Sequence, residues 1–439
     1  MNTMTNNPTA AQETLTTGLK QKSRSKWVAN FAKTQILKRL NNLQIGCLTI
    51  IDGQEKHVFG QTKNNTENNT ENNKVDSIKA TIYVSDPRFY GEIAFGGSIG
   101  AGEAYMLGYW TSDNLTDVIR LMCVNQQVMD TLEGGYQWAT KPLMKVLHWL
   151  NSNTTEGSRK NIAAHYDLGN DFFKLWLDPS MMYSSGIFEH ANSTLEASSF
   201  KKLKVICDKL DLKTTDHLVE IGTGWGGFAI FAARHYGCKV TTTTISKQQY
   251  ALAVERVKAA NLDSVITVLL NDYRDLEGQF DKLVSIEMVE AVGHQFYDTY
   301  FAKVGSLLKP DGLALIQAIT ISDQRFESAK NSVDFIQRYI FPGSCIPSNT
   351  AMLNSITKTS DMRLFDCEDI GPHYATTLAA WRENFFAQID AVRKLGYSEE
   401  FIKMWEFYLC YCEGGFAERA LGDVHLLLAK PDNRRAALI

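Results

Sequence analysis

The sequence predicts an α/β protein with a mostly parallel sheet covered by helices on both faces, an aromatic-rich helical insertion and a smaller N-terminal α/β domain. Two observations carry this prediction. From about residue 217 onward, short apolar runs alternate with helical segments, which is typical of parallel strands joined by helices. The first of these runs ends in a glycine-rich turn, Gly222 to Gly227, that leads directly into a helix.

The expected strands of the main sheet are short and rich in apolar or β-branched residues. They lie at His217–Ile221, Lys239–Thr244, Ile266–Leu270, Lys282–Ile286, Leu313–Ile319 and Val424–Leu428. The first helix runs from Phe228 to Tyr236, and Ser246 with Gln249 predicts a capping box at the start of the next. The sequence LKPDG at 308–312 predicts a helix end and a tight turn before the fifth strand.

A long segment from Thr320 to Leu421 separates the fifth strand from the last and is rich in Phe, Tyr and Trp. Such a segment forms either a cap over the carboxyl edge of the sheet or a second layer of core. Ligands of open α/β sheets bind outside the carboxyl ends of the strands, so we favour the cap.

An N-terminal domain is expected over residues 1–150, followed by the main domain over 151–439. Two strand-like runs, Ile45–Ile51 and Ala80–Val84, flank a polar repeat at 62–74 that predicts a long, disordered hairpin loop.

The glycine-rich stretch that follows these runs, from Phe95 onward, predicts a turn into a helix near Gly102. Here the chain is expected to leave the small sheet and begin a helix of the N-terminal domain.

The composition is ordinary for a globular protein of 439 residues, with 44% hydrophobic and 21% charged residues and a net charge of −4. This charge argues against nucleic acid as a partner. No apolar run is long enough to cross a bilayer, and the first residues lack the apolar core of a secretion signal. Eight scattered cysteines show neither a disulfide framework nor paired metal spacing. We therefore expect a cytoplasmic protein with no metal site.

Charge is uneven near the N-terminus. No acid occurs between Glu13 and Asp52, while seven residues there are Lys or Arg. The apolar residues Trp27, Phe31, Ile36 or Leu37, and Leu40 fall near helical spacing in the same stretch. This pattern is typical of a basic helix on an anionic membrane surface, and equally of an ordinary helix with a solvated basic face.

The glycine-rich turn indicates a nucleotide-like cofactor, because backbone N–H groups at the start of a helix can bind such a ligand closely. Gly222, Gly224 and Gly227 also match the dinucleotide pattern, but a nicotinamide enzyme places an acid at the end of the next strand. Residues 239–245 contain none. The acid instead precedes the first glycine, at Glu220, where it suits a ligand with an ammonium group. We therefore expect S-adenosylmethionine rather than NAD.

Further motifs, in the same order over about residues 160–430, resemble the cyclopropane-fatty-acyl-phospholipid synthases and the related mycolic acid enzymes. The motifs are NIAAHYDLGNDFF at 161–173, MYSS at 182–185, NDYR at 271–274, EMVEAVG at 287–293, YIFPG at 339–343 and YATTL with Trp at 374–381. A weaker match from Gly102 to Trp110 is similar to the N-terminal domain of the bacterial phospholipid-acting members.

This resemblance implies a class I methyltransferase with a seven-stranded Rossmann-like sheet. It implies transfer of a methyl carbon from S-adenosylmethionine to the cis double bond of an unsaturated phospholipid acyl chain. Methyl transfer leaves a carbocation, and a base must then remove a proton from the new methyl group for a ring to close. In the family this base site holds a bicarbonate ion. The resemblance also implies a homodimer at the inner face of the cytoplasmic membrane.

The catalytic residues implied by the resemblance come from four motif positions. Glu290 and Tyr374 match the glutamate and the tyrosine of the family's bicarbonate site. Ile319 matches a residue that contributes its backbone to that site, and Cys412 matches a cysteine near the end of the active site.

Two positions depart from the family pattern. Ser185 stands where many synthases have cysteine, and Gln317 stands where they have histidine. Both side chains can form hydrogen bonds and so still hold bicarbonate. Loss of the histidine leaves two products open: a cyclopropane, or a methyl- or methylene-branched chain such as a furan precursor.

The remaining implied contacts are to S-adenosylmethionine. They are Glu220, Gly222 and Gly224 for the methionyl part, Thr244, Ser246 and Gln249 after the second strand, Tyr273 and Arg274 near the adenine, and Tyr166, Tyr183 and Ser184 as further donor contacts. Two other functions stay open from the sequence: methylation of a soluble small molecule, and a catalytically inactive lipid-binding protein.

Overall fold

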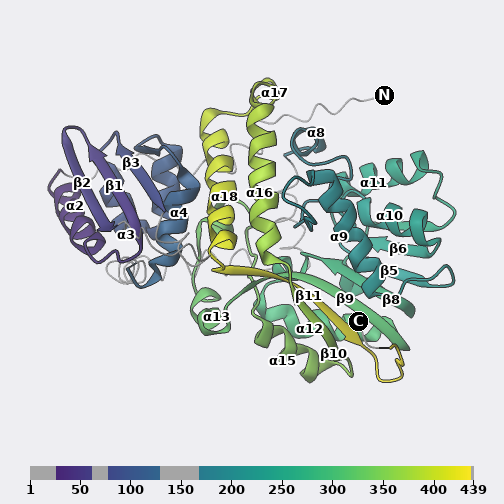
Figure 1. Cartoon of the computed structure of the whole chain (residues 1–439). Helices are drawn as coiled ribbons and strands as arrows, with labels where there is room; N and C mark the ends of the chain where they lie inside the picture. Colours follow the sequence, from purple (N-terminus) through teal and green to yellow (C-terminus); the bar gives the residue numbers. More distant parts are fainter. Residues whose placement is uncertain (1–25, 62–77, 129–167, 437–439) are drawn as a thin grey trace.

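The computed structural model describes residues 26–61, 78–128 and 168–436. Within these ranges the chain forms two sheets, a four-stranded one near the N-terminus and a seven-stranded one in the larger part (Figure 1). Two long helices, α16 (Gly371–Ala387) and α18 (Glu399–Ala417), lie side by side between the two sheets. The expected domain boundary near residue 150 lies outside the described residues.

The large sheet confirms the predicted mostly parallel architecture. Its strands are β5 (His217–Ile221), β6 (Lys239–Thr243), β7 (Ile266–Leu269), β8 (Phe280–Ile286), β9 (Leu308–Ile321), β10 (Arg363–Asp369) and β11 (Leu421–Ala429). Their order is β10-β11-β9-β8-β5-β6-β7, with β5 to β9 parallel and β11 antiparallel to both of its neighbours. β5 is central and buried because helices cover both faces, which is why its sequence is a short apolar run.

Helices precede β5 and connect most of the following strands, as the predicted alternation of strands and helices requires. They are α8 (Asn170–Lys174), α9 (Leu195–Lys209), α10 (Gly227–Tyr236), α11 (Lys247–Ala259), α12 (Tyr297–Ser306), α13 (Asp323–Ala329), α14 (Phe335–Tyr339), α15 (Asn349–Thr359), α16 (Gly371–Ala387), α17 (Ile389–Lys394) and α18 (Glu399–Ala417). Where a turn is expected at 308–312, β9 already begins at Leu308, but its pairing with β8 is irregular: it passes from Leu308 to Leu313, so the four residues between them are not paired with β8.

The aromatic segment is only partly the cap that the sequence favours. Its strand β10 extends the sheet, a role that the prediction missed. The rings of α16 and α18 form core: Trp381 and Trp405 pack around Trp176 near α8, in a cluster that continues into the N-terminal part. Both expected roles, cap and core, are therefore divided among its elements.

The N-terminal part consists of α2 (Lys26–Leu40), β1 (Gly46–Asp52), β2 (Glu55–Gln61), β3 (Lys79–Val84), α3 (Arg88–Met106), β4 (Trp110–Ser112) and α4 (Leu115–Val124). The prediction that the runs near 45–51 and 80–84 form a hairpin is wrong, because β1 and β3 pair in parallel. The hairpin partner of β1 is β2, reached through a tight turn at Gly53 with φ 60°. The polar repeat at 62–74 lies outside the described residues.

The helix expected near Gly102 is the second half of α3, which as a whole begins at Arg88. Gly97, with φ 55° and ψ −133°, is not helical and divides α3 into two helices at a kink, so a helix begins a few residues before Gly102. Gly102 allows close packing, because a Cβ there would lie 2.4 Å from the ring of Phe335. The same helix is tied to the main part by Tyr339, whose hydroxyl donates to Glu103 at 2.6 Å.

The basic N-terminal stretch forms α2 from Lys26 onward. Its apolar side chains Ile36 and Leu40 are buried in the N-terminal core, whereas Phe31 is 38% exposed. Lys33 donates to Asp52 at 2.6 Å, so part of its charge is neutralised within the domain. Across the described ranges, none of the helices combines the length and the apolar character needed to cross a membrane.

Candidate active site

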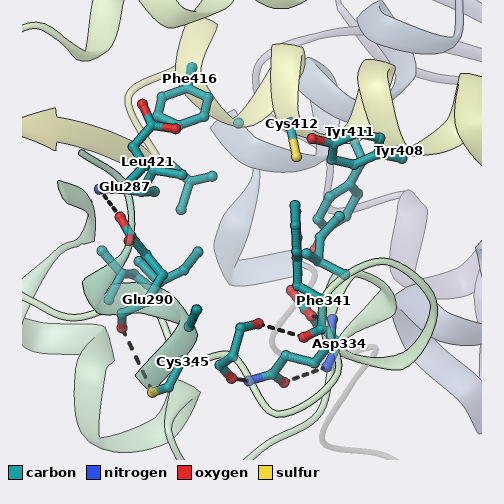
Figure 2. Close-up of a pocket in the computed structure, with 18 of the residues that line it drawn as sticks. Glu287, Glu290, Asp334, Phe341, Cys345, Tyr408, Tyr411, Cys412, Phe416 and Leu421 are labelled. Atoms are coloured by element: carbon teal, nitrogen blue, oxygen red, sulfur yellow. Dashed lines mark hydrogen bonds between the residues drawn. The ribbon is translucent and has the colours of Figure 1, made fainter. Parts of the chain in front are cut away.

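A cavity of about 970 Å³ connects the two parts of the molecule. It begins at the glycine turn after β5, passes the carboxyl groups of Glu287 and Glu290, and ends inside the N-terminal part. Figure 2 shows these two acids on one side and Tyr408 and Tyr411 of α18 on the other. Its N-terminal end is lined mainly by apolar residues of α2, β1, α3 and α4, such as Ile36, Ile50, Phe89, Ile119 and Met122.

The glycine turn has the backbone that a close ligand requires. Gly222 and Gly224 line the cavity with φ values of 101° and 51°, in the region that favours glycine. A Cβ at Gly224 would meet no atom within 4 Å, so open space lies beside its backbone. Such a bare backbone before the N-terminus of α10 fits the predicted cofactor position.

Glu220 is the second-last residue of β5, just before this turn, and lines the same cavity. The Thr242 hydroxyl donates to Glu220 Oε2 at 2.6 Å, and burial raises the pKa of the carboxyl to about 8. A ligand ammonium would restore the ionised form by supplying a positive charge. The predicted contact to the methionyl part of the cofactor therefore fits the electrostatics.

The residues after β6 form one small hydrogen-bonded group. Thr244 donates to Gln249 Oε1 at 2.8 Å, and both residues line the cavity. Ser246 caps α11 by accepting from the Gln249 N–H at 3.3 Å. The predicted capping box is thus only half formed, because the Gln249 side chain bonds to Thr244 instead of the N-cap backbone. Ser246 is not among the cavity-lining residues.

Tyr273 and Arg274 form the 3₁₀ turn η4 (Tyr273–Asp275) at the cavity wall. Tyr273 packs edge-on against Tyr300, and Arg274 pairs with Asp272 through Nε at 2.8 Å and Nη2 at 2.7 Å. Asp272 belongs to the NDYR motif, but the sequence analysis assigned it no role. Its carboxylate fixes the orientation of the Arg274 guanidinium.

Of the three further residues predicted to contact the methyl donor, the structure describes Tyr183 and Ser184, whereas Tyr166 lies outside the described residues. Tyr183 lines the cavity, and its hydroxyl lies 2.9 Å from that of Tyr408. Ser184 accepts a hydrogen bond from Lys202, which is fully buried. Burial lowers the pKa of this ammonium, while the nearby carboxyls Glu287 and Asp423 favour its charged form. Lys202 gave no local signal in the sequence.

Glu287, not Glu290, is the centre of a hydrogen-bond network at the cavity wall. Its Oε1 accepts from the backbone N–H of Ser185 at 2.9 Å and from Gln317 Nε2 at 2.8 Å. Its Oε2 accepts from the Tyr374 hydroxyl at 2.6 Å. Three predicted catalytic residues therefore meet on a carboxylate that was not predicted.

The side chains of Ser185 and Gln317 do not reach the cavity surface. The Ser185 hydroxyl donates to the Gly186 carbonyl at 3.1 Å, so only its backbone serves the site. Gln317 is fully buried behind Glu287 and also donates to Asp423 at 2.9 Å. The expectation that both side chains hold a ligand directly is therefore not met.

Glu290, Ile319 and Cys412 line the cavity as predicted. The Ile319 N–H donates to Glu290 Oε1, while Glu290 Oε2 is buried with no hydrogen-bond partner among the described residues. Burial and the charge of Glu287 raise the pKa of Glu290 to about 8. Burial also raises the pKa of the Cys412 thiol on α18, which argues against a thiolate there.

Asp423 and Glu287 were missed as site residues, and only one of them had a readable signal. Glu287 directly follows β8, which pairs in parallel with β5, so its side chain belongs at the same sheet edge as Glu220. Asp423 sits on β11 near Gln317 through long-range pairing that the local sequence does not indicate.

Burial and Glu287 raise the pKa of Asp423. Burial therefore raises the pKa of each of the three acids Glu287, Glu290 and Asp423.

The fold and this cavity define a class I S-adenosylmethionine-dependent methyltransferase. A family model described as mycolic acid cyclopropane synthetase matches residues 153–426. The chain belongs to this family, as its motifs predicted.

Individual relatives agree with this assignment. Over 347 residues, the chain is 38% identical to the cyclopropane-fatty-acyl-phospholipid synthase of Escherichia coli, covering 78% of this chain and 86% of the relative. It is 37% identical over 338 residues to the tuberculostearic acid methyltransferase UfaA1 of Mycobacterium tuberculosis, covering 73% and 76%. The solved cyclopropane synthase MmaA2 of Mycobacterium tuberculosis is 30% identical with a TM-score of 0.58, covering 62% of this chain and 98% of that one.

Proposed function

We propose that this enzyme transfers one carbon from S-adenosylmethionine to the cis double bond of an unsaturated acyl chain in a membrane phospholipid. The observation that carries this proposal is the shared cavity. One continuous space joins the glycine turn and Glu220 to the acids Glu287 and Glu290, and then to an apolar end. A sulfonium methyl, an alkene and a proton acceptor can thus meet away from bulk water.

The apolar end of the cavity supports a lipid substrate. It lies inside the N-terminal part, where a soluble polar metabolite would find few partners. Its dimensions suit a long chain in addition to the cofactor, since pockets of about 300–1,000 Å³ commonly enclose whole ligands. The names of the E. coli and M. tuberculosis relatives also refer to acyl lipids.

The first candidate product is a cyclopropane fatty acid. The second is a methyl- or methylene-branched chain, which one observation favours: Gln317 replaces the family histidine, and it supports Glu287 rather than facing the cavity. The name of the UfaA1 relative supports the same alternative. Both products require the same methyl transfer and differ in how the cation is quenched.

The test is to incubate purified protein and S-adenosylmethionine with vesicles of an unsaturated phospholipid. Mass spectrometry of the released fatty acids should show one added carbon. Upfield ring protons in the NMR spectrum would identify a cyclopropane, and vinylidene or branched-methyl signals would identify the second candidate. Absence of added carbon from every unsaturated lipid tested would contradict the proposed function.

Filling the apolar end of the cavity should reduce lipid turnover without affecting cofactor binding. Gly96 of α3 lines the cavity, and a Cβ there would meet no atom within 4 Å. We expect Gly96→Phe to lower activity on long acyl chains by about tenfold or more, because it occupies the space of the chain. The measurement is turnover on phospholipids of different chain length, with S-adenosylmethionine affinity as a second readout.

Gly96→Ala is the matched control for this prediction. It makes the same backbone change but leaves the cavity open, and it should stabilise the helix by up to about 1 kcal/mol. Equal activity of the Phe and Ala variants on long chains would show that the substrate does not enter this end.

We further propose that the enzyme is a homodimer that binds the inner face of the cytoplasmic membrane. The basic end of α2, Lys38 and Arg39, supports contact with anionic lipid. Sedimentation with anionic and neutral vesicles tests the membrane contact, and light scattering tests the oligomeric state. Equal binding to both vesicle types would contradict the electrostatic part of this proposal.

A further inference from the structure

The structure does not fit the bicarbonate ion that the resemblance implies. The expected binding groups are the Ser185 position, Gln317, Tyr374, Glu290 and the Ile319 backbone. The first three already donate to the Glu287 carboxylate, and the Ile319 N–H donates to Glu290. A second carboxylate-like anion would find these donors taken and would lie against two acids.

We infer that the side-chain carboxylate of Glu287 takes the place of bicarbonate and is the catalytic base of this enzyme. This inference rests on the proposed function, since it names the group that removes the proton after methyl transfer. A carboxylate on the chain offers the same planar pair of oxygens as bicarbonate. Glu287 also lines the cavity, so those oxygens lie at its wall (Figure 2).

The backbone at Glu287 supports this assignment. The residue has φ 48°, in the left-handed region that a non-glycine residue enters at a cost of about 1–2 kcal/mol. Such strain persists only where the surroundings hold the residue firmly. Here the backbone N–H of Glu287 donates to the Gln317 carbonyl at 2.8 Å, and three further donors hold the side chain.

The neighbours of Glu287 also suit a base that must accept and then release a proton. Hydrogen bonds from Tyr374 and the Ser185 backbone favour the ionised carboxylate, as does the nearby Lys202. Burial works against ionisation, and it is the largest influence, so the pKa of Glu287 is raised above its usual value. Opposing influences of this kind keep a buried carboxyl able to exist in both protonation states.

The proposed step conserves atoms and electrons. The alkene electron pair forms a bond to the methyl carbon as the bond from that carbon to sulfur breaks, giving S-adenosylhomocysteine and a carbocation on the chain. Glu287 then accepts a proton from the new methyl group. The electrons of that C–H bond close a ring onto the cationic carbon or, after a hydride shift, form a methylene double bond.

The first test compares wild-type activity on unsaturated phospholipid vesicles in carbonate-free buffer with and without added bicarbonate. We expect no change, because the resident carboxylate already fills the site. Stimulation of the wild-type enzyme by bicarbonate would overturn the inference. A wild-type enzyme that adds no carbon in either buffer would instead contradict the proposed function, so the two failures are distinguishable.

The second test removes the carboxylate with Glu287→Gly, which also relieves the left-handed backbone. We expect a fall in turnover of about 100-fold or more in carbonate-free buffer, the typical contribution of a general base. Added bicarbonate should restore part of it. Glu287→Gln should be equally slow but not restored, because its amide still occupies the space.

Two readouts besides activity complete this test. ¹³C NMR should detect binding of ¹³C-bicarbonate to Glu287→Gly but not to the wild type, and calorimetry should show S-adenosylmethionine affinity within about twofold of the wild type. Full activity of Glu287→Gly without bicarbonate would overturn the inference. So would failure of bicarbonate to restore a variant that still binds the cofactor. If the glycine variant does not fold, unimpaired turnover by Glu287→Gln would overturn it.

Discussion

Replacing Glu220 by glutamine is expected to weaken S-adenosylmethionine binding by roughly 10- to 100-fold, the usual value of a hydrogen bond to a charged group. The carboxyl lies at the end of β5 beside the glycine turn, lines the cavity and is almost fully buried. The amide keeps the shape and the bond to Thr242 but cannot attract an ammonium. Calorimetry on the wild type and the variant measures the difference, and equal affinities would contradict the assigned role.

Because of the raised pKa of Glu220, we also expect the affinity for S-adenosylmethionine to increase with pH below about pH 8. Burial raises the pKa of Glu220 to about 8 in the ligand-free protein, so at lower pH the carboxyl is protonated. Binding an ammonium requires the ionised form and therefore releases a proton. Affinity should rise by about tenfold per pH unit up to about pH 8, then fall as the ligand amine, with a pKa near 8, loses its own charge.

Calorimetry in buffers of different ionisation enthalpy counts the released proton directly. Glu220→Gln is the control, because it should remove both the proton release and the rise in affinity below pH 8. Wild-type affinity that is constant between pH 6 and pH 8 would show that Glu220 does not bind the ammonium.

Replacing Gly224 by alanine should lower S-adenosylmethionine affinity by about tenfold or more, or about 1.4 kcal/mol. The added methyl group meets no protein atom within 4 Å, so it extends into the space assigned to the cofactor. The substitution also strains the backbone, since φ is 51°, and should cost about 1–2 kcal/mol of stability. Calorimetry and thermal unfolding separate the two effects.

Gly53 is a matched control for this substitution. It has φ 60° in the turn between β1 and β2, and a Cβ there also meets no atom within 4 Å. Gly53→Ala should lose a similar amount of stability and keep full cofactor affinity. If both variants bind S-adenosylmethionine equally well, the glycine turn is not the cofactor site.

The main sheet was predictable because its strands carry local signals. A buried parallel strand such as β5 is a short apolar run, and a helix that begins after glycine or Ser246 is visible in the sequence. β10 was missed because its sequence, RLFDCED, is largely polar and exposed at the sheet edge. β2 was missed for the same reason, and with it the true hairpin partner of β1.

The cofactor half of the site was predictable for a similar reason. Glu220 and the glycines are neighbours in sequence, so their shared role can be read directly. The catalytic half depends on long-range contacts. Gln317 lies on β9, Asp423 on β11 and Tyr374 on α16, and only the fold brings them around Glu287. Motif matching identified Tyr374 and Gln317 without revealing which group they bind.

The most direct test of the central claim uses S-adenosylmethionine with a fully deuterated methyl group and vesicles of unsaturated phospholipid. We expect the acyl chain to gain one carbon. In a cyclopropane or a methylene-branched chain that carbon keeps two of its three deuterium atoms, because the methyl group is transferred whole and then gives one deuteron to the base, whereas in a methyl-branched chain it keeps all three. The carbon-bound deuterium that leaves the cofactor should appear only in the lipid, and the deuteron taken by the base should be released to water. An acyl chain that carries no deuterium after incubation with enzyme, cofactor and vesicles would contradict lipid carbon transfer by this enzyme. Deuterium found only on a soluble acceptor would contradict it as well.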